Sequence, residues 1–188
     1  DRSRFSFFRF PLFNPAALFR GLDRLLSPFR FLAFLLLPGV PLCLMVVYQN
    51  GSAYSADLSR LGFETGLGST LIKILVAMIS TNLFSKIIQG TVAAHFQTAP
   101  RVFGIRLLFG VIPRFYIEKS QIKRTERRAR LWIYAASMLT RLGFFCLGIG
   151  LWYLSRDQGH HLAAYSMFFG LIGMGSFLFV ANPLWKAD

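Results

Sequence analysis

Two cations inside apolar stretches are the residues of this sequence most suggestive of chemistry. Lys86 and Arg141 lie within runs of apolar residues long enough to cross a bilayer. A charge at the centre of a membrane costs at least ~3 kcal/mol, so each marks a functional site unless a structural partner stabilises it. For Arg141 that partner would be a carbonyl, a polar face or a cofactor. Lys86 could partly snorkel toward the cytoplasm, and Lys73 is expected to snorkel at the outer end of the same run.

Other patterns typical of active sites are missing from the sequence, which has no glycine-rich phosphate loop, no Cys/His cluster and no paired carboxylates. His95 is expected at the cytoplasmic end of its helix, whereas His160 and His161 are expected on the opposite side of the membrane. These histidines therefore cannot converge on one metal ion. Cys43 and Cys146 lie in apolar runs and are expected to be reduced, packed thiols.

Four apolar helices must position these residues. The chain has 188 residues, of which 54% are hydrophobic, and a mean hydropathy of +0.50. A helix needs about 20 residues to cross roughly 30 Å of hydrocarbon. We therefore expect an all-α membrane protein with spans at about 29–49, 69–96, 131–154 and 162–181. Pro38 and Pro41 predict a kink in the first span. The small residues Gly170, Gly173, Gly175 and Ser176 predict that the last helix is buried among the others.

The charge of the connecting segments predicts the orientation. Residues 1–30 carry six Arg and two Asp, and residues 97–130 carry nine Lys or Arg and two Glu. The segments 50–68 and 155–161 carry one Arg each. Because basic loops remain in the cytoplasm, both termini are expected there. The net charge of +13 is thus explained by membrane topology, and we expect no nucleic-acid partner.

Two segments outside the spans have structure of their own. Asn14-Pro15 predicts a helix start, and the residues that follow place Leu18, Leu22, Leu25 and Leu26 on one side of an amphipathic, interfacial helix. Residues before it alternate Phe with Arg and Ser, which indicates a basic arm that touches lipid headgroups or docks on a protein. Residues 1–28 are therefore expected to form a cytoplasmic arm and interfacial helix, and residues 29–188 a four-helix membrane domain. The β-prone segment 101–117, broken by Gly110 and Pro113, predicts a cytoplasmic β-hairpin or re-entrant segment.

Three segments resemble one family. IPRFYI followed by EKSQIKRTERRARLW, FPLFNPAALF near the N-terminus and NPLWKAD at the C-terminus are similar to stretches of the site-2-protease-like membrane zinc metalloproteases. The resemblance is to the branch associated with HlyD-type periplasmic adaptors, and it covers nearly the whole chain. It implies a bacterial inner-membrane location. In that family the N-P-x-x-x-x-D signature supplies a third zinc ligand, which here corresponds to Asn182, Pro183 and Asp188.

The resemblance also implies a helix with the motif H-E-x-x-H, in which two histidines bind zinc and the glutamate is the general base. The matching positions here are Ser85, Lys86 and Gln89, so both histidines and the base are replaced. Only Asp188 remains of the expected ligands. We therefore expect no bound metal and no cofactor, and we predict a Lys86–Asp188 salt bridge in place of the ion.

Three functions remain open. The first is a catalytically inactive member of the family that works as a membrane scaffold or accessory subunit, with a HlyD-type adaptor as one candidate partner in an export assembly. The second is a structural subunit of a larger respiratory, photosynthetic or secretion complex. An active intramembrane metalloprotease is the third. For all of them the partners are the lipid bilayer and other membrane subunits.

Overall fold

The computed structural model describes residues 9–26, 29–63, 66–108, 112–118, 120–157 and 160–182. The chain is mostly helical and divides into two compact units. The first unit comprises residues 1–28 and 82–137, and the second comprises residues 29–81 and 138–188. Two long helices, α4 (Leu67–His95) and α6 (Arg127–Ser155), each contribute residues to both units. The expected division into a cytoplasmic arm and a membrane domain concerns location and stays a prediction.

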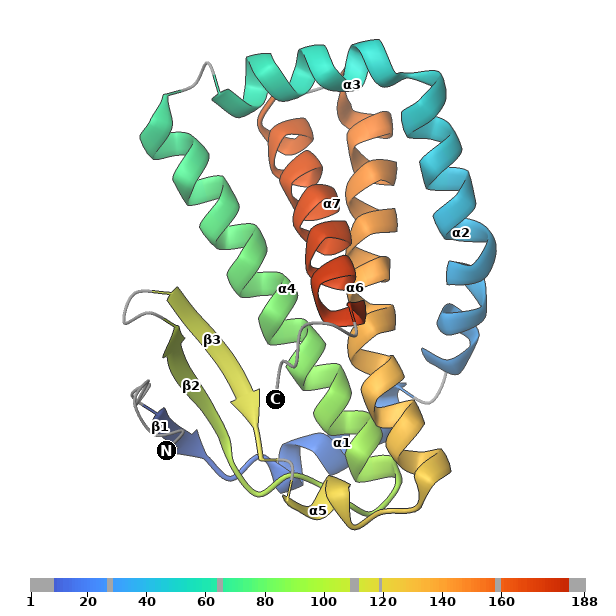
Figure 1. Ribbon diagram of the computed structural model, residues 1–188, viewed down its shortest axis with the longest axis vertical. Helices are drawn as coiled ribbons and strands as arrows, with labels where there is room; N and C mark the ends of the chain where they lie inside the picture. The colour runs from blue at the N-terminus through green and yellow to red at the C-terminus, as the bar shows by residue number, and fades with distance from the viewer. Residues whose placement is uncertain are drawn as a thin grey trace. The chain divides into compact units, whose positions relative to one another are not determined.

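The first unit contains a small antiparallel sheet (Figure 1). Its strand order is β1-β2-β3, and the strands are β1 (Arg9–Phe13), β2 (Phe103–Leu108) and β3 (Ile112–Ile117). The pairing of β2 with β3 confirms the hairpin alternative for residues 101–117. The expected fold class has no strand beyond this hairpin, and it is wrong for residues 9–13, because they pair with β2 as a third strand. A two-stranded hairpin alone is only marginally stable, and the added strand extends its hydrogen bonding. Residues 1–8 lie outside the described residues.

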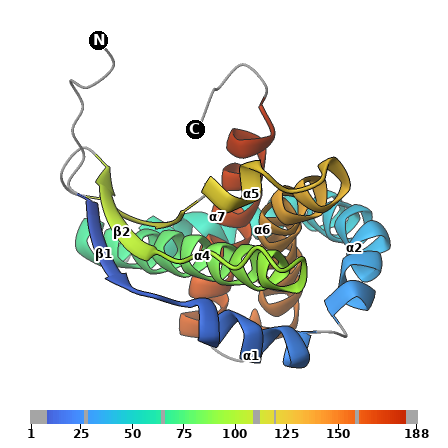
Figure 2. The same ribbon diagram turned by 90° about the horizontal axis from the view of Figure 1, so that it is seen from below.

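Helix α1 (Ala16–Leu26) packs beside the C-terminal end of α4 in the same unit (Figure 2). It begins where the sequence predicts, with the Asn14 side chain accepting a hydrogen bond from the Ala16 amide at 3.2 Å. Its buried residue is Phe19, with 0% exposure, whereas Leu18 is 51% exposed. The predicted interfacial position of this helix stays a prediction. Leu22 packs against the core, and the side chains of Leu25 and Leu26 lie outside the described residues.

One face of the sheet forms the core of the first unit. Phe103 and Ile117 are opposite each other in the β2–β3 register, and both are buried. The ring of Phe19 meets Phe103 edge-on with centroids 6.4 Å apart. Ile122 of the short helix α5 (Ser120–Lys123) and Ile133 of α6 complete this cluster.

The second unit contains α2 (Phe29–Gln49), α3 (Gly51–Asp57), the π-helical segment η1 (Leu58–Phe63) and α7 (His160–Ala181), together with parts of α4 and α6. Helix α3 and η1 occupy much of the segment 50–68, for which the sequence analysis predicted no helix. The main bend is also not at the prolines. Helix α2 is continuous through Pro38 and Pro41, and the chain turns by 82° at Asn50. The Asn50 side chain stabilises this turn by donating to the Val46 carbonyl and accepting from Arg156.

Trp152 of α6 is the centre of the core of the second unit. It is fully buried among Ala163, Ala164 and Met167 of α7. Tyr54 of α3 meets the Trp152 ring edge-on at 4.9 Å. The indole nitrogen of Trp152 also donates to Asp57 Oδ2 at 3.0 Å. These contacts hold α3 across the ends of α6 and α7 (Figure 1).

Glycines bring α6 and α7 close together. A Cβ added to Gly148 would overlap the backbone of Gly170, and one added to Gly173 would lie 2.7 Å from the Phe145 amide nitrogen. The predicted packing role of Gly170 and Gly173 is confirmed by these contacts. Gly175 is different, because it faces open space.

Among the described residues, three helices are long and apolar enough to cross a membrane, namely Leu67–His95, Arg127–Ser155 and Leu162–Ala181. The bent pair Phe34–Gln49 and Gly51–Arg60 would be a fourth if it is counted as one span. The four predicted spans therefore correspond to helices, which is the part of the predicted fold class that is confirmed.

Candidate functional site

Ser85, Lys86 and Gln89, the three positions expected to correspond to the protease motif, lie on α4, in its part that belongs to the first unit. Ser85 and Gln89 are one helical turn apart and therefore share a face. That face is covered by protein, since Ser85 is 0% exposed and Gln89 is 2% exposed. Lys86 is half-buried beside them. The helix thus places these three side chains together, as the motif spacing requires.

Ser85 is hydrogen-bonded to a second serine. Its hydroxyl lies 2.8 Å from the hydroxyl of Ser137 on α6, and it also donates to the Ser137 carbonyl at 3.2 Å. A serine becomes a nucleophile when a neighbouring base takes its proton. Ser137 is not a base, so this pair joins two helices without activating either hydroxyl. Ser137 was not predicted from the sequence, because no local pattern connects it with Ser85.

Lys86 is hydrogen-bonded to the third motif position. Its Nζ donates to Gln89 Oε1 at 2.9 Å. Gln89 therefore directs its oxygen, the atom that could best approach a cation, toward an ammonium group. In the motif that the sequence resemblance implies, the position of Lys86 would be that of the general base, and an ammonium cannot accept a proton.

These residues do not fit a zinc ion. Zinc sites in proteins are built from Cys, His, Asp and Glu side chains. Ser85 and Gln89 could offer a metal only neutral oxygen atoms, and these atoms already form hydrogen bonds to other protein groups. Lys86 adds a positive charge that would repel a metal cation. Within the described part of the chain, no three His, Cys, Asp or Glu side chains come close enough to hold a metal ion.

Arg141 of α6 and Asn182 belong to the second unit. Arg141 is 4% exposed, and the Asn182 amide donates to the Leu178 carbonyl at the end of α7. Pro183 and Asp188 lie outside the described residues, so the Lys86–Asp188 salt bridge stays a prediction. Lys73 was expected to snorkel, but it is buried by surrounding protein and is only 4% exposed.

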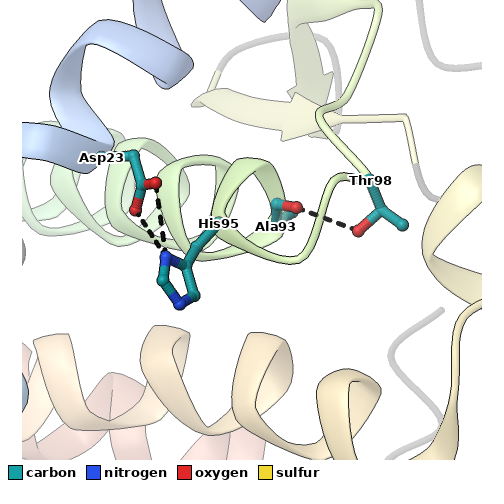
Figure 3. Close-up of polar contacts among 4 residues, drawn as sticks. All are labelled: Asp23, Ala93, His95 and Thr98. Carbon is teal, nitrogen blue, oxygen red and sulfur yellow. Dashed lines mark hydrogen bonds and ion pairs between the residues drawn. The ribbon is translucent and has the colours of Figure 1, made fainter.

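A polar contact that the sequence did not predict joins α1 to the end of α4 (Figure 3). The Nδ1 atom of His95 lies 3.1 Å and 3.3 Å from the two carboxylate oxygens of Asp23. Nearby, the Thr98 hydroxyl donates to the Ala93 carbonyl at 3.0 Å and so satisfies a carbonyl at the helix end. From the sequence, His95 was considered only as a metal ligand. Its partner is a carboxylate 72 residues away, which local spacing does not indicate.

Comparisons with protein-family models, with curated proteins and with solved structures find no match to this chain.

Proposed function

We propose that this chain is a catalytically inactive, site-2-protease-like membrane protein that works without a metal as a scaffold or accessory subunit. The observation that carries the proposal is the hydrogen bond from Lys86 Nζ to Gln89 Oε1. By the resemblance, Lys86 occupies the position of the general base and Gln89 that of a zinc ligand. The ammonium group of Lys86 binds the Gln89 oxygen directly. The resemblance to the family rests on the three sequence segments described above.

The chemistry of the three positions supports an inactive protein. A zinc hydrolase needs a metal that lowers the pKa of a bound water, and a base that takes the proton of that water. Ser85 is hydrogen-bonded to Ser137, and Lys86 is hydrogen-bonded to Gln89. A divalent cation at this place would have to break these bonds and stand beside an ammonium. Both effects disfavour binding.

The apolar surface supports a role inside a membrane. Helix α2 exposes large apolar side chains to its surroundings, among them Phe34, Leu37 and Tyr48 at 67%, 73% and 89% exposure. In water such a surface would be costly, whereas lipid or a partner helix would cover it. We place the protein in the bacterial inner membrane with both termini in the cytoplasm, and a HlyD-type adaptor is the partner that the resemblance indicates.

The proposal is tested by zinc content. The purified, detergent-solubilised chain is measured by elemental analysis beside a restored variant that carries Ser85→His, Lys86→Glu and Gln89→His. We expect less than about a tenth of an equivalent of zinc in the native chain and about one equivalent in the restored variant, because two histidines four residues apart share one helix face.

A matched control carries the restored motif together with Asp188→Ala, which removes the third ligand that the family resemblance implies. We expect this control to lose most of the zinc. Near-stoichiometric zinc in the native chain would overturn the proposal. If the restored variants bind zinc equally well with and without Asp188, the assignment of Asp188 as the third zinc ligand is wrong.

The alternative role is a structural subunit of a larger membrane complex, and the same exposed apolar side chains would suit it. The two roles differ in their partners. Mild detergent extraction followed by affinity purification would yield one stoichiometric membrane complex in the alternative case. The export role instead predicts that a HlyD-type adaptor co-purifies.

A further inference from the structure

The edge of the sheet in the first unit exposes several large apolar side chains. Phe10, Leu12 and Phe13 of β1 and Leu18 of α1 are each 50% to 52% exposed. Strand β1 leads directly into α1, so these four residues lie within nine positions of the chain (Figure 2). Single apolar residues on a surface are ordinary, whereas such a concentration marks a surface that contacts something apolar. We name these four residues the apolar edge.

A β-bulge places two of these side chains on the same face of the sheet. Phe10 is opposite Ile105 and Phe13 is opposite Phe103, so Leu12 is the extra residue of β1. Ile105 and Phe103 are two positions apart on β2 and share a face, and their partners on β1 therefore share it too. The rings of Phe13 and Phe103 lie 5.5 Å apart. The apolar edge thus continues the core of the unit to the border of the sheet, where it is half uncovered.

The backbone of β1 is poorly suited to pairing with a further strand. The strand order β1-β2-β3 makes β1 an edge of the sheet. Pro11, in the middle of β1, has no N–H to donate, and the bulge at Leu12 interrupts the regular pairing. Prolines and bulges are the features by which edge strands avoid pairing with other chains. The apolar edge therefore offers its side chains, rather than a hydrogen-bonding strand, to its surroundings.

The charge of the first unit favours anionic surroundings. Its two segments, residues 1–28 and 82–137, contain fifteen of the 21 Lys and Arg residues of the chain but four of the eight Asp and Glu residues. Arg20 is exposed on α1, two positions after Leu18. Apolar side chains together with an excess of basic ones are typical of protein surfaces that bind membranes containing anionic lipid.

We propose that the apolar edge inserts into the headgroup region of a bilayer leaflet that contains anionic phospholipid. Lipid can surround the outer edge of a strand and the exposed parts of its side chains at once, and it requires no hydrogen bonds from the backbone. The half exposure of the four side chains fits the shallow insertion of interfacial segments, which is about 5–10 Å deep. This inference rests on the proposed membrane location, but not on the loss of the zinc site.

The test measures how close the apolar edge lies to lipid. The sequence has two cysteines, Cys43 and Cys146, and replacing both by alanine gives a chain without thiols. Leu12→Cys then carries an environment-sensitive fluorophore, and the full chain is reconstituted into phosphatidylcholine vesicles with or without phosphatidylglycerol. Quenching by phospholipid with a nitroxide near the headgroup is recorded. The matched control carries the label at Ser120→Cys, an exposed position of α5 in the same unit.

We expect the nitroxide lipid to quench the label at position 12 more strongly than the label at position 120, and phosphatidylglycerol to enlarge this difference. Raising the salt concentration from about 0.1 M to about 1 M shortens the Debye length from about 10 Å to about 3 Å, so the contribution of phosphatidylglycerol should be lost.

Leu18→Glu should weaken quenching at position 12, because burial of a carboxylate is costly and anionic headgroups repel it. Leu18 is half-exposed, so the melting temperature in neutral detergent should be unchanged. That second readout separates loss of insertion from loss of folding. Unchanged quenching in Leu18→Glu would overturn the inclusion of α1 in the inserted surface.

Resistance to alkaline carbonate extraction shows whether the chain itself is inserted. Equal quenching at positions 12 and 120 in a resistant chain would overturn this inference and leave the proposed membrane location intact. Extraction of the chain by carbonate would overturn both. A label at position 12 that is shielded from water but not quenched by the nitroxide lipid would show that a second copy covers the apolar edge. Quenching that is equal with and without phosphatidylglycerol would overturn the role of anionic lipid.

Discussion

The ring of Phe19 lies against the backbone of Gly90, the residue that follows Gln89 on α4. A Cβ at Gly90 would overlap three ring carbons of Phe19. The absence of a side chain at this one position therefore allows α1 to pack on α4 at the level of the candidate site. Helix α1 therefore packs on α4 next to the position of Gln89, within the first unit.

Substitution of Gly90 by alanine should destabilise this packing. The methyl group would force the buried Phe19 ring aside, and overpacking of this kind lowers the free energy of unfolding by about 1–3 kcal/mol. Phe19→Leu in the same chain should recover part of the loss, because the smaller side chain vacates the overlapping volume. Gly143→Ala on α6 is the control, since a Cβ there meets open space. Denaturant titrations followed by tryptophan fluorescence measure the four proteins, and an equal loss for Gly143→Ala would contradict the packing argument.

The contributions of Ser85 and Ser137 to stability should be coupled. Ser85→Ala removes the partner of a buried hydroxyl and should lower the free energy of unfolding by about 1–3 kcal/mol. Ser137→Ala should have a similar effect. The double variant should lose clearly less than the sum of both, because either single substitution already removes the hydrogen bond between the two hydroxyls. Strictly additive losses in this double-mutant cycle would show that the 2.8 Å contact contributes nothing to stability.

The hydrogen bond from Trp152 to Asp57 should stabilise the second unit. Trp152→Phe retains most of the buried ring but leaves the carboxylate of Asp57 without this donor, so the free energy of unfolding should fall by about 1–3 kcal/mol. Asp57→Asn keeps an oxygen acceptor in place and should cost less. If Asp57→Asn proves the more damaging of the two, the charge of Asp57 rather than its hydrogen bond is what matters. Thermal unfolding in detergent compares the two variants.

The two cysteines should cross-link α2 to α6. Cys43 and Cys146 are free thiols, and Cys43 Sγ donates to the Cys146 carbonyl at 3.7 Å. Mild oxidation with copper phenanthroline should therefore form an intramolecular disulfide, which closes a loop and makes the denatured chain run faster on a gel. Cys43→Ser is the control and should show no shift. A purely intermolecular product in the native chain would mean that α2 does not pack on α6 in this way.

Local patterns in the chain predict where the long helices lie. Hydrophobic length predicts the spans because a bilayer requires about 20 apolar residues, and this property is contained in one segment of sequence. The start of α1 at Asn14 and the hairpin of residues 101–117 were predicted for the same reason, since caps and turns depend on adjacent residues. The motif spacing correctly placed Ser85 and Gln89 on one helix face.

The sequence by itself thus determined which long segments are helical. Only the tertiary structure decided their partners. Ser137 lies 52 residues from Ser85, and Asp23 lies 72 residues from His95, so neither contact is encoded in a local period. The same holds for the pairing of β1 with β2 and for the burial of Phe19. Such contacts depend on how completed elements pack against one another, and packing is decided by shape and volume across the whole unit.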